Sequence, residues 1–515
     1  MNPWVRASLR DLAAQPVDVL VIGGGITGAG IAREAALAGL AVAVVDARDF
    51  GAGTSSRSSR LVHGGLRYLE HGHLRLVFEA VRERAVLLRL APHLVRPLPF
   101  VLPVYRGDRI GRWKVAAGLT LYDLLAARGN VSRHRSLGKR ALLRREPLLR
   151  ERGLAGGALY WDAQCDDARL VIAVLRAAAA RGARLASYTA VTGLLNRDGR
   201  TVGARLKDTR SGEEGKLLAR LVVNATGPWV DELRRMEDPY VQPLLRLTRG
   251  AHVLVPRSRI GNRHAILFTS PEDGRAMFVL PWGEEWTYIG TTDTDDVTGP
   301  EDGAWRERDV VYLLRSANAL FPAARLAQED VVSAWAGLRP LIADDPALPP
   351  GAVSREHRLV MGVTGVLSIA GGKLTTFRRM ARTVLRTGLE TLGRRHKLSA
   401  ESAREPLPGG ESDAVAGFRE QGLELGLRIG TADRLVARYG TEAPALHALC
   451  REQRSLMTPI HPEHPAIGAE VVHAVRRELA VTVEDVLVRR LQVARETRDG
   501  GEAAREAVVK LMGES

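Results

Sequence analysis

Apolar runs and helical periodicities alternate along the first fifty residues. Residues 19–22 form an unbroken apolar run, an alanine-rich stretch closing at Gly39 follows, and residues 40–45 are apolar again. Such runs are typical of strands and the stretch between them of a helix, so strand, helix and strand are predicted in that order. A strand followed by a helix is predicted again at residues 366–381, where an apolar run is followed by a Gly-Gly pair and then by a basic segment.

The middle of the chain carries shorter apolar runs. Residues 251–256, 276–281 and 286–292 are bounded by Pro or Gly and predict strands. Residues 168–181 instead carry apolar side chains at helical spacing, which predicts a helix that packs on a sheet.

A Pro/Gly-rich stretch at residues 403–410 precedes a C-terminal part that has amphipathic helices and few strand signals. We place the boundary near residue 398. Thr482, followed three residues later by Asp485, predicts a helix start in this part. One apolar helix face is predicted to combine Val471, Val472, Val475 and Leu479.

Composition narrows the class of protein. The 515 residues suffice for about three domains of ~150 residues, and 45% apolar with 26% charged residues is ordinary for a globular protein. No apolar run reaches the roughly 18 residues of a membrane-spanning helix, and the N-terminal arginines do not fit a signal peptide. With only Cys165 and Cys450, neither a disulfide framework nor a metal site is expected, and a reducing cytosolic setting fits.

The formal net charge of +15 would attract nucleic acid, an anionic membrane surface or a phosphorylated substrate. Only seven of the 74 basic residues are lysines, so part of the excess reflects a bias toward arginine. Aromatic residues make up 5% of the chain and do not interleave with basic ones in the way that stacks bases. Nucleic acid is therefore not expected as a partner.

The densest basic cluster flanks an amphipathic segment at residues 113–127. This segment is too short to span a bilayer but is suited to lie in its interface, and an internal helix with a solvated basic face is the alternative. The flanking cluster includes Arg106, Arg109, Arg112, Arg133, Arg135, Arg140, Arg144 and Arg145.

The first strand–helix turn carries Gly23-x-Gly25-x-x-Gly28, with Ile26 and Thr27 between the last two glycines. Gly23 permits a tight turn, Gly25 lets the backbone approach a pyrophosphate, and Gly28 allows close packing of helix on strand. The helix N-terminus favours the same anion. With its strand–turn–helix–strand context complete, the motif predicts a dinucleotide site.

Asp46 ends the second strand, where a carboxylate can accept both hydroxyls of an adenosine ribose. Arg48, two residues on, would suit a 2′-phosphate. These residues therefore leave the choice between FAD and NAD(P) open.

The segment after this unit is rich in hydroxyls and bare backbone, which suit the rest of a pyrophosphate and the edge of a flavin ring. A Ser/Gly-rich surface loop is the alternative. The hydroxyl residues are Thr54, Ser55, Ser56 and Ser59, and a wall of His63, Gly64, Gly65 and Leu66 follows, with Arg67 and Tyr68 behind it.

Two distant segments suit the same ligand. The apolar run after residue 221 ends in Ala225, Thr226 and Gly227, and a strand that stops at a small-residue turn can pass close to a cofactor. An ordinary strand-to-turn signal is the alternative. Lys373 follows the second Gly-Gly pair, where a cation and a helix N-terminus can share one anion, although such a lysine is also common on solvated surfaces.

Seven motifs together resemble one family, the FAD-dependent, membrane-associated and quinone-linked glycerol-3-phosphate dehydrogenases of the D-amino-acid-oxidase-like flavoproteins. In chain order they are GGGITGAG, TSSRSSRLVHGGLRYLE, YWDAQCDDARLV, NATGPWVD, IGTTDT, AGLRPL and AGGKLTTFRRMA. The resemblance runs from about residue 17 to about 390 and continues more faintly into the C-terminal helices. Asp46 departs from it, because such flavoproteins more often have glutamate there.

The resemblance implies an α/β fold with three parts. A Rossmann-like FAD-binding domain combines separated segments, an antiparallel sheet forms a substrate domain, and a helical cap domain follows. The expected segments are 17–85, 155–232 and 340–395 for FAD, 86–154 and 233–339 for substrate, and 398–515 for the cap.

The resemblance also implies a reaction, the oxidation of sn-glycerol 3-phosphate to dihydroxyacetone phosphate with hydride transfer to FAD N5. His63 and His252 are candidate proton acceptors, because an imidazole titrates near neutrality, and His63 has the better support from its sequence context. Arg339 or the hydroxyls of Thr375 and Thr376 could complete a proton relay.

Cationic forks would clamp the phosphate. The candidates are Arg67, Arg339 and Arg355, with Tyr68 donating a hydroxyl, while Lys373 would serve the flavin pyrimidine edge or the substrate anion. Val191, Gly372, Leu374 and Thr375 complete the expected cofactor contacts.

Membership would further imply a membrane quinone as acceptor and peripheral attachment to the anionic inner face of the cell membrane from the cytoplasm. A glycerol-3-phosphate oxidase using dioxygen is the nearest alternative, and another amine or hydroxy-acid oxidoreductase is a second. A basic, FAD-containing RNA-modifying or RNA-binding protein is the alternative from a different class. The oligomeric state is left open, a homodimer included.

Overall fold

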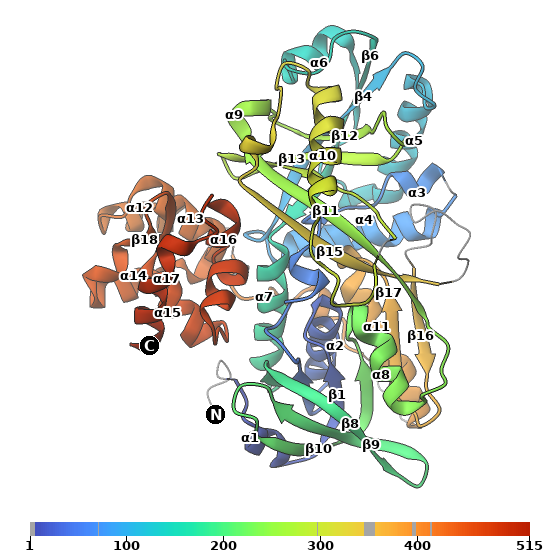
Figure 1. The fold of residues 1–515 in the computed structure, drawn as a ribbon, viewed down its shortest axis with the longest axis vertical. Helices are drawn as coiled ribbons and strands as arrows, with labels where there is room; N and C mark the ends of the chain where they lie inside the picture. Colours follow the sequence, from blue (N-terminus) through green and yellow to red (C-terminus); the bar gives the residue numbers. More distant parts are fainter. Residues whose placement is uncertain are drawn as a thin grey trace.

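The computed structural model describes residues 6–70, 72–295, 297–343, 356–393, 398–412 and 415–514, without the side chains of Arg67, Glu70 and Arg128. These residues form two large sheets and a C-terminal helical body, which lies beside α7 in orange to red in Figure 1.

The first sheet has the strand order β16-β17-β10-β1-β2-β7, extended by the β8–β9 hairpin on β10. Its central pairs are parallel, whereas β16 and the hairpin pair antiparallel. The strands are β1 (Val17–Ile22), β2 (Val42–Val45), β7 (Arg184–Ala186), β8 (Thr189–Arg197), β9 (Arg200–Asp208), β10 (Glu214–Asn224), β16 (His357–Met361) and β17 (Leu367–Gly371).

Burial on both faces explains the unbroken apolar run of β1. Val19 and Val21 pack in the core shared with three helices, while Leu20 and Ile22 pack with β9 and the N-terminal helix. The three helices are α2 (Ile26–Leu37), α7 (Asp167–Ala179) and α11 (Phe377–Thr391), and the N-terminal helix is α1 (Leu9–Ala13). The strand, helix and strand predicted at the start of the chain are confirmed as β1, α2 and β2.

The second sheet has the order β15-β11-β14-β13-β12-β4-β6-β3, with β5 on β6, and is antiparallel except where β12 meets β4. The three runs predicted as strands in the middle of the chain fall in β11, β13 and β14. The strands are β3 (Leu61–Val62), β4 (Val95–Tyr105), β5 (Arg135–Gly138), β6 (Leu154–Cys165), β11 (Leu245–Pro256), β12 (Ala265–Thr269), β13 (Ala276–Trp282), β14 (Trp286–Gly290) and β15 (Ser333–Ile342).

Each face of the second sheet is covered. Val253 and Val255 of β11 pack under α10. Leu254 points to the other face, where it packs with Phe100 of β4 and with Leu119 of α5. The helices around this sheet are α3 (Arg67–Glu70), α4 (Leu74–Leu90), α5 (Arg112–Ala126), α6 (Lys139–Arg145), α9 (Arg257–Ile260) and α10 (Glu307–Leu320). Helix α8 (Val230–Glu237) instead contacts β8 and β17 of the first sheet. Strands β3 and β6 belong to this sheet although most of their residues lie in segments that we expected to bind FAD.

The C-terminal body is mainly helical, as predicted. One expectation there is wrong: Leu479 does not continue the helix of Val471 and Val472, because α15 ends at Arg477 and Leu479 has a left-handed backbone. Thr482 and Asp485 do bond each other, and a π-helical turn over Asp485–Arg490 follows. The other elements are α12 (Ala416–Glu424), α13 (Ile429–Tyr439), α14 (Ala443–Glu452), β18 (Pro459–His461), β19 (His464–Ile467), α15 (Gly468–Arg477), α16 (Val493–Glu496) and α17 (Arg505–Gly513).

Buried ion pairs join the C-terminal body to the first sheet's helices and loops. The Arg169 guanidinium of α7 makes two hydrogen bonds, of 2.7 and 3.2 Å, to the carboxylate of Glu478. Arg490 likewise binds Asp49 at 2.6 and 2.8 Å. Since each pair is nearly or fully buried, loss of one partner would leave an uncompensated charge.

Candidate active site

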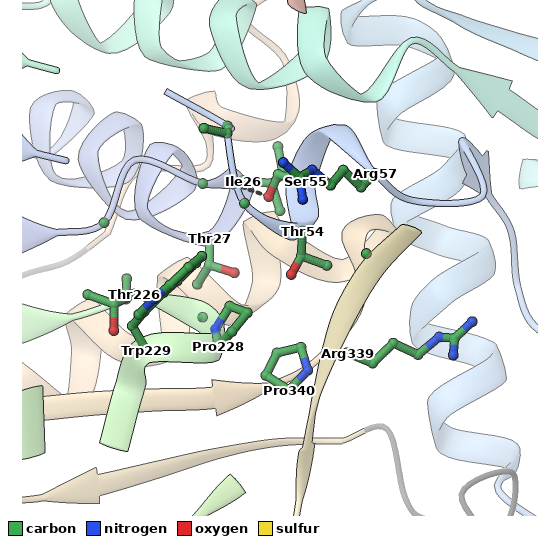
Figure 2. A pocket seen from close by; sticks show the side chains of 18 of the residues that line it. Ile26, Thr27, Thr54, Ser55, Arg57, Thr226, Pro228, Trp229, Arg339 and Pro340 are labelled. Atoms are coloured by element: carbon green, nitrogen blue, oxygen red, sulfur yellow. Dashed lines mark hydrogen bonds between the residues drawn. The ribbon is translucent and has the colours of Figure 1, made fainter. Parts of the chain in front are cut away.

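A cavity of about 520 Å³ lies where the two sheets meet. Its walls come from the N-terminus of α2, the loop after β2, the ends of β10 and β17, and strands β11 and β15. In Figure 2, Thr27, Thr54 and Ser55 lie between the corner formed by Thr226 and Trp229 and the strand that carries Arg339. A cavity of this size is typical of a cofactor site.

Close backbone packing explains the glycines at the first turn. A Cβ on Gly23 would lie 2.5 Å from the Ala225 carbonyl oxygen, and one on Gly28 would lie 1.9 Å from the Gly23 oxygen. Ser55 accepts a 3.0 Å hydrogen bond from the backbone N–H of Ile26 (Figure 2). The loop after β2 is thereby fixed against the helix start, and a bare backbone faces the cavity.

Asp46 stands at the end of this cradle where the sequence predicts an adenosine. Its carboxylate accepts hydrogen bonds from the N–H groups of Gly24, at 2.7 Å, and Arg48, at 2.9 Å. Burial raises the pKa of Asp46 to about 6, against the effect of these two bonds. The carboxylate is held by backbone at the end of β2, where the sequence predicted a ribose contact.

Arg48 is engaged by side chains that the sequence did not suggest. Its guanidinium binds the Glu301 carboxylate at 2.5 Å and lies 5.0 Å from the ring centroid of Trp229. Trp229 in turn donates a 2.8 Å hydrogen bond to Glu301. The three side chains form a clasp beside the adenosine end, and an arginine paired in this way does not favour a 2′-phosphate. Trp229 was visible within a quoted motif, whereas Glu301 carried no sequence signal.

The corner after β10 is built by its own polar groups. Thr226 donates a 2.7 Å hydrogen bond to Asn224, whose amide donates at 2.9 Å to the Val230 carbonyl. Gly227 has φ +61° and no atom within 4 Å of a Cβ position, so the turn needs its conformation and not its small size.

The His63–Gly65 wall is fixed from behind. His63 donates its backbone N–H to the Thr375 hydroxyl at 3.1 Å, and the same hydroxyl bonds the His63 carbonyl at 3.3 Å. The Gly64 N–H reaches the Tyr122 hydroxyl at 2.9 Å. Gly65 has φ +77°, and the Tyr68 ring lies where its Cβ would be. Gly64 is therefore required by space, since a Cβ there would lie 2.3 Å from the Tyr122 hydroxyl, and Gly65 is required by both space and backbone conformation.

Lys373 meets this wall from β17. Its ammonium lies 3.5 Å from the centroid of the Tyr68 ring, a cation–π arrangement. Lys373 precedes a single 3₁₀ turn over Leu374–Thr376 and then α11. The wall thus brings a cation and a phenol to one side of the cavity.

His252 of β11 is a buried imidazole, 2% exposed, on the cavity wall. Its Nε2 lies 2.9 Å from the Ser59 hydroxyl, and its ring stacks on Trp335 with centroids 5.2 Å apart. Burial, followed by the charges of Arg339 and two further arginines, lowers the pKa of His252 well below its usual value. The imidazole is therefore neutral at neutral pH.

Arg339 of β15 lies over β11 beside this histidine. It donates 2.8 Å hydrogen bonds to Asp293 and Thr291, so its guanidinium is held in place by the protein itself. A Cβ on Gly250 would lie 2.2 Å from this guanidinium, which explains the glycine opposite.

The structure brings most of the predicted site residues to one cavity. The predicted residues that line it are Gly23, Gly25, Ile26, Thr27, Asp46, Thr54, Ser55, Ser59, His63, Tyr68, Val191, Ala225, Thr226, Gly227, His252, Arg339, Gly372, Lys373, Leu374 and Thr375. Those that are described but do not line it are Gly28, Ser56, Gly64, Gly65, Leu66 and Thr376.

Two predicted phosphate ligands remain predictions. Arg355 and the side chain of Arg67 lie outside the described residues. Lining residues that sequence reasoning missed include Arg57, Trp229, Glu301 and Pro340. The described residues hold no cluster of three or more His, Cys, Asp or Glu side chains suited to a metal ion.

FAD fits the residues that are present. The glycine turn leaves no room for a side chain where a pyrophosphate would pass, the helix start faces the cavity, and a carboxylate closes β2. Gly23, Gly25, Ile26 and Asp46 would hold the adenosine and pyrophosphate half, and the wall near Lys373 would border the ring. The fold and the cavity thus define a dinucleotide-binding oxidoreductase.

Comparison with known proteins makes the class specific. Residues 18–453 match the family described as FAD dependent oxidoreductase, and residues 400–515 match the C-terminal domain of alpha-glycerophosphate oxidase. The aerobic glycerol-3-phosphate dehydrogenase of Staphylococcus haemolyticus is 36% identical over 497 residues, which are 93% of this chain and 87% of that protein. The chain belongs to the FAD-dependent oxidoreductases and, within them, to the aerobic glycerol-3-phosphate dehydrogenase family. Its cofactor is FAD.

Solved structures agree. The glycerol-3-phosphate dehydrogenase from Bacillus halodurans, complexed with FAD, superposes with a TM-score of 0.82 at 31% identity, covering 98% of this chain and 92% of that one. The L-alpha-glycerophosphate oxidase from Mycoplasma pneumoniae shares the fold, with a TM-score of 0.57 at 16% identity over 75% of this chain and 97% of that one.

Proposed function

We propose that this protein oxidises sn-glycerol 3-phosphate to dihydroxyacetone phosphate and passes the electrons to a membrane quinone. One observation carries the proposal. The same cavity is lined by the FAD cradle, by a cation, Lys373, and by a neutral buried imidazole, His252. The names of relatives at about this length and 36% identity support the same substrate.

The oxidation removes one hydride and one proton from the substrate. Bound FAD would supply the hydride acceptor for C2, and the two electrons, with two protons, would then convert a quinone to a quinol. The alcohol becomes a ketone as the proton of the 2-hydroxyl leaves for a base on the protein. The chain's own residues must therefore hold the phosphate, orient C2 and accept that proton.

His252 suits the proton-accepting role because its lowered pKa keeps the imidazole neutral. The bond to Ser59 and the stack on Trp335 hold the ring in one orientation. His63, whose backbone is tied to Thr375, is the second candidate. Arg339, fixed by Asp293, would put a positive charge beside the hydroxyl as it loses its proton and would stabilise the developing alkoxide.

Lys373 and Tyr68 suit the substrate phosphate. A lysine ammonium binds phosphate as a compact charge, and a phenol adds a hydrogen-bond donor. Their close contact on the Gly65 backbone fixes both at one place. Arg67 and Arg355 remain proposed partners in the same clamp.

The experiment is an anaerobic titration of the purified yellow protein with sn-glycerol 3-phosphate, followed by the visible absorption of the flavin. Bleaching by this ester, but not by glycerol or a D-amino acid, is the expected result. A flavin-loaded protein that stays oxidised would overturn the proposal. Lys373→Met should raise the KM for the ester, while Lys216→Met, at an exposed position on β10, serves as its control.

A glycerophosphate oxidase is the second candidate, and the match of residues 400–515 to the C-terminal domain of alpha-glycerophosphate oxidase favours it. The two functions differ only in the acceptor. Hydrogen peroxide formed in equal amount to the substrate consumed would identify the oxidase. Reduction of a soluble quinone without peroxide would identify the dehydrogenase.

We also assign a membrane-facing surface to α4 and α5, from the cytoplasmic side. Trp113 and Leu124 of α5 are 72% and 70% exposed, and Phe78 of α4 is exposed nearby. Basic side chains lie on these rings: Lys114 is 5.6 Å from the Trp113 ring and Arg82 is 4.6 Å from that of Phe78. Apolar tips among cations suit an anionic bilayer surface. Among the described residues no helix is long and apolar enough to cross a membrane.

Vesicle binding tests this surface. The wild-type protein should sediment with phosphatidylglycerol vesicles and not with phosphatidylcholine vesicles, and Trp113→Ser with Leu124→Ser should abolish sedimentation. Tyr240→Ser, at a 90% exposed aromatic side chain on another surface, is the matched control. Sedimentation unchanged by the double substitution would overturn the assignment, and a dimer that dissociates with it would instead assign the surface to a second copy of the chain.

A further inference from the structure

His252 stands at the end of a buried column of aromatic and cationic groups. Its ring is stacked on Trp335 at an interplanar angle of 13°. The guanidinium carbons of Arg60 and Arg495 each lie 5.4 Å from the centroid of that same indole. Arg60 also lies 4.0 Å from the ring of Trp282. Two buried cations therefore share the aromatic ring on which the imidazole rests.

The column crosses from one body of the molecule to another. Arg495 belongs to α16 in the C-terminal body, and its carbonyl accepts a 2.6 Å hydrogen bond from Ser333, two residues before Trp335. Gln492, also in that body, hydrogen-bonds the buried guanidinium of Arg60 and donates at 3.0 Å to Asp166. The C-terminal body thus contacts the wall of the active site through defined polar groups.

The loop that carries Arg60 also reaches the histidine directly. Ser59 bonds His252, and the Tyr288 hydroxyl donates a 2.8 Å hydrogen bond to the Ser59 carbonyl. Arg60 has φ +52°, a backbone conformation that residues other than glycine rarely adopt. The surrounding contacts must therefore hold it. The contacts to Gln492 and the two indoles supply that restraint.

We propose that Arg495 of the C-terminal body, together with Arg60, acts as a positioning residue that holds the imidazole of His252 in its orientation and keeps positive charge on the Trp335 ring against which it stacks. The inference rests on the proposed function only for the chemical step that His252 performs. It assigns the C-terminal body a part in the active site, although none of that body's residues is among those that line the cavity.

The electrostatics agree with this geometry. After burial, the charges that lower the pKa of His252 are those of Arg339, Arg60 and Arg495, in that order. Arg339 is paired with Asp293. The remaining acids nearby, Asp166, Asp167 and Glu496, are bonded respectively to Gln492, Ser58 and His464. Removing the Arg495 charge should therefore raise the pKa of His252.

The first test follows histidine titration by NMR in the FAD-loaded protein carrying ¹³C-labelled histidine, with His252 assigned by the signal lost in His252→Gln. In Arg495→Met the midpoint of His252 should rise, by less than the roughly one to three pH units that a charge within about 6 Å produces, because the Trp335 indole lies between the two groups. Arg495→Lys should restore the wild-type midpoint. Arg498→Met, an exposed arginine of the same segment, should leave it unchanged.

Enzyme kinetics gives the second readout. The acidic limb of kcat/KM for sn-glycerol 3-phosphate should move to higher pH in Arg495→Met, with the KM at the optimum unchanged, because Arg495 does not line the cavity. If that variant does not fold, Arg495→Gln replaces it, and Arg60→Met removes the other cation from the same ring. A His252 midpoint that stays at its wild-type value in these variants overturns the proposal.

The two proposals fail separately. A wild-type enzyme that does not oxidise the ester overturns the proposed function, while the NMR midpoint still decides the role of Arg495. A midpoint that moves without a matching move of the kinetic limb supports the positioning role and counts against His252 as the base.

Discussion

At the scale of single residues, two glycines make room for the side chains of Arg339 and His252, which we propose to be catalytic. Gly250 and Gly290 lie on neighbouring strands, and a Cβ at either position would collide with Arg339 or His252. These contacts were invisible in the sequence, because the partners are 89 and 38 positions away. The glycines of the first turn, by contrast, were identified from their spacing alone.

Gly290→Ala should lower kcat/KM by about 10²-fold, because a Cβ 2.2 Å from the imidazole must displace His252 and misplaced groups cost rates of that order. Steady-state kinetics and the flavin spectrum check this. FAD content should stay normal. Gly299→Ala, where no atom lies within 4 Å of the added carbon, is the control and should keep full activity.

Glu301→Gln should weaken FAD binding up to about fivefold, since an exposed ion pair contributes about 1 kcal/mol at most. The substitution loosens the clasp of Arg48 and Trp229 beside the adenosine end. Equilibrium titration of the apoprotein with FAD measures the effect. Unchanged affinity would show that the contacts of Glu301 with Arg48 and Trp229 do not contribute to FAD binding.

At the scale of elements, sequence and structure agree where periodicity is local. The strand–helix–strand start, α7 and the three short strands of the second sheet were all predicted, because each is specified by neighbouring residues. The pairing of strands was not predicted. Strands β3 and β6 belong to the second sheet, and the register of β11 on β15 places His252 opposite Trp335. Contacts across sheets depend on long-range packing that one sequence does not display.

The α7 contact with the C-terminal body supports a prediction about stability. Glu478→Gln should destabilise the protein by about 3 kcal/mol, because it leaves the buried Arg169 charge uncompensated. Denaturant unfolding measures this. Glu484→Gln, at an exposed position in the same body, should change stability little. Equal effects of the two substitutions would contradict the assigned importance of the pair.

At the scale of the whole molecule, acid should destabilise the fold, and groups of the C-terminal body contribute to this effect. Burial lowers the pKa of His473 to about 4, so below pH 6.5 the unfolded chain binds a proton that the folded chain does not. The pKa of Glu496 is held at about 2 by its bond to His464, despite burial, so its stabilisation is lost as pH falls from about 4.5 toward 2. Both effects have the same sign.

Thermal unfolding measured from pH 7 to pH 4 should therefore show a Tm that falls steadily. His473→Gln should flatten the upper part of this fall. A Tm that is constant over the whole range would contradict the prediction.

The column from Arg495 to His252 has a consequence for synthesis on the ribosome. The cradle for FAD needs β1, β10 and β17, so its last strand is translated only after some 370 residues. Arg495, which we propose to orient His252, is translated more than a hundred residues later. Translation of the cradle and translation of this residue are thereby separated in time: a nascent chain can acquire its cofactor cradle well before it acquires the residue that we propose to orient His252.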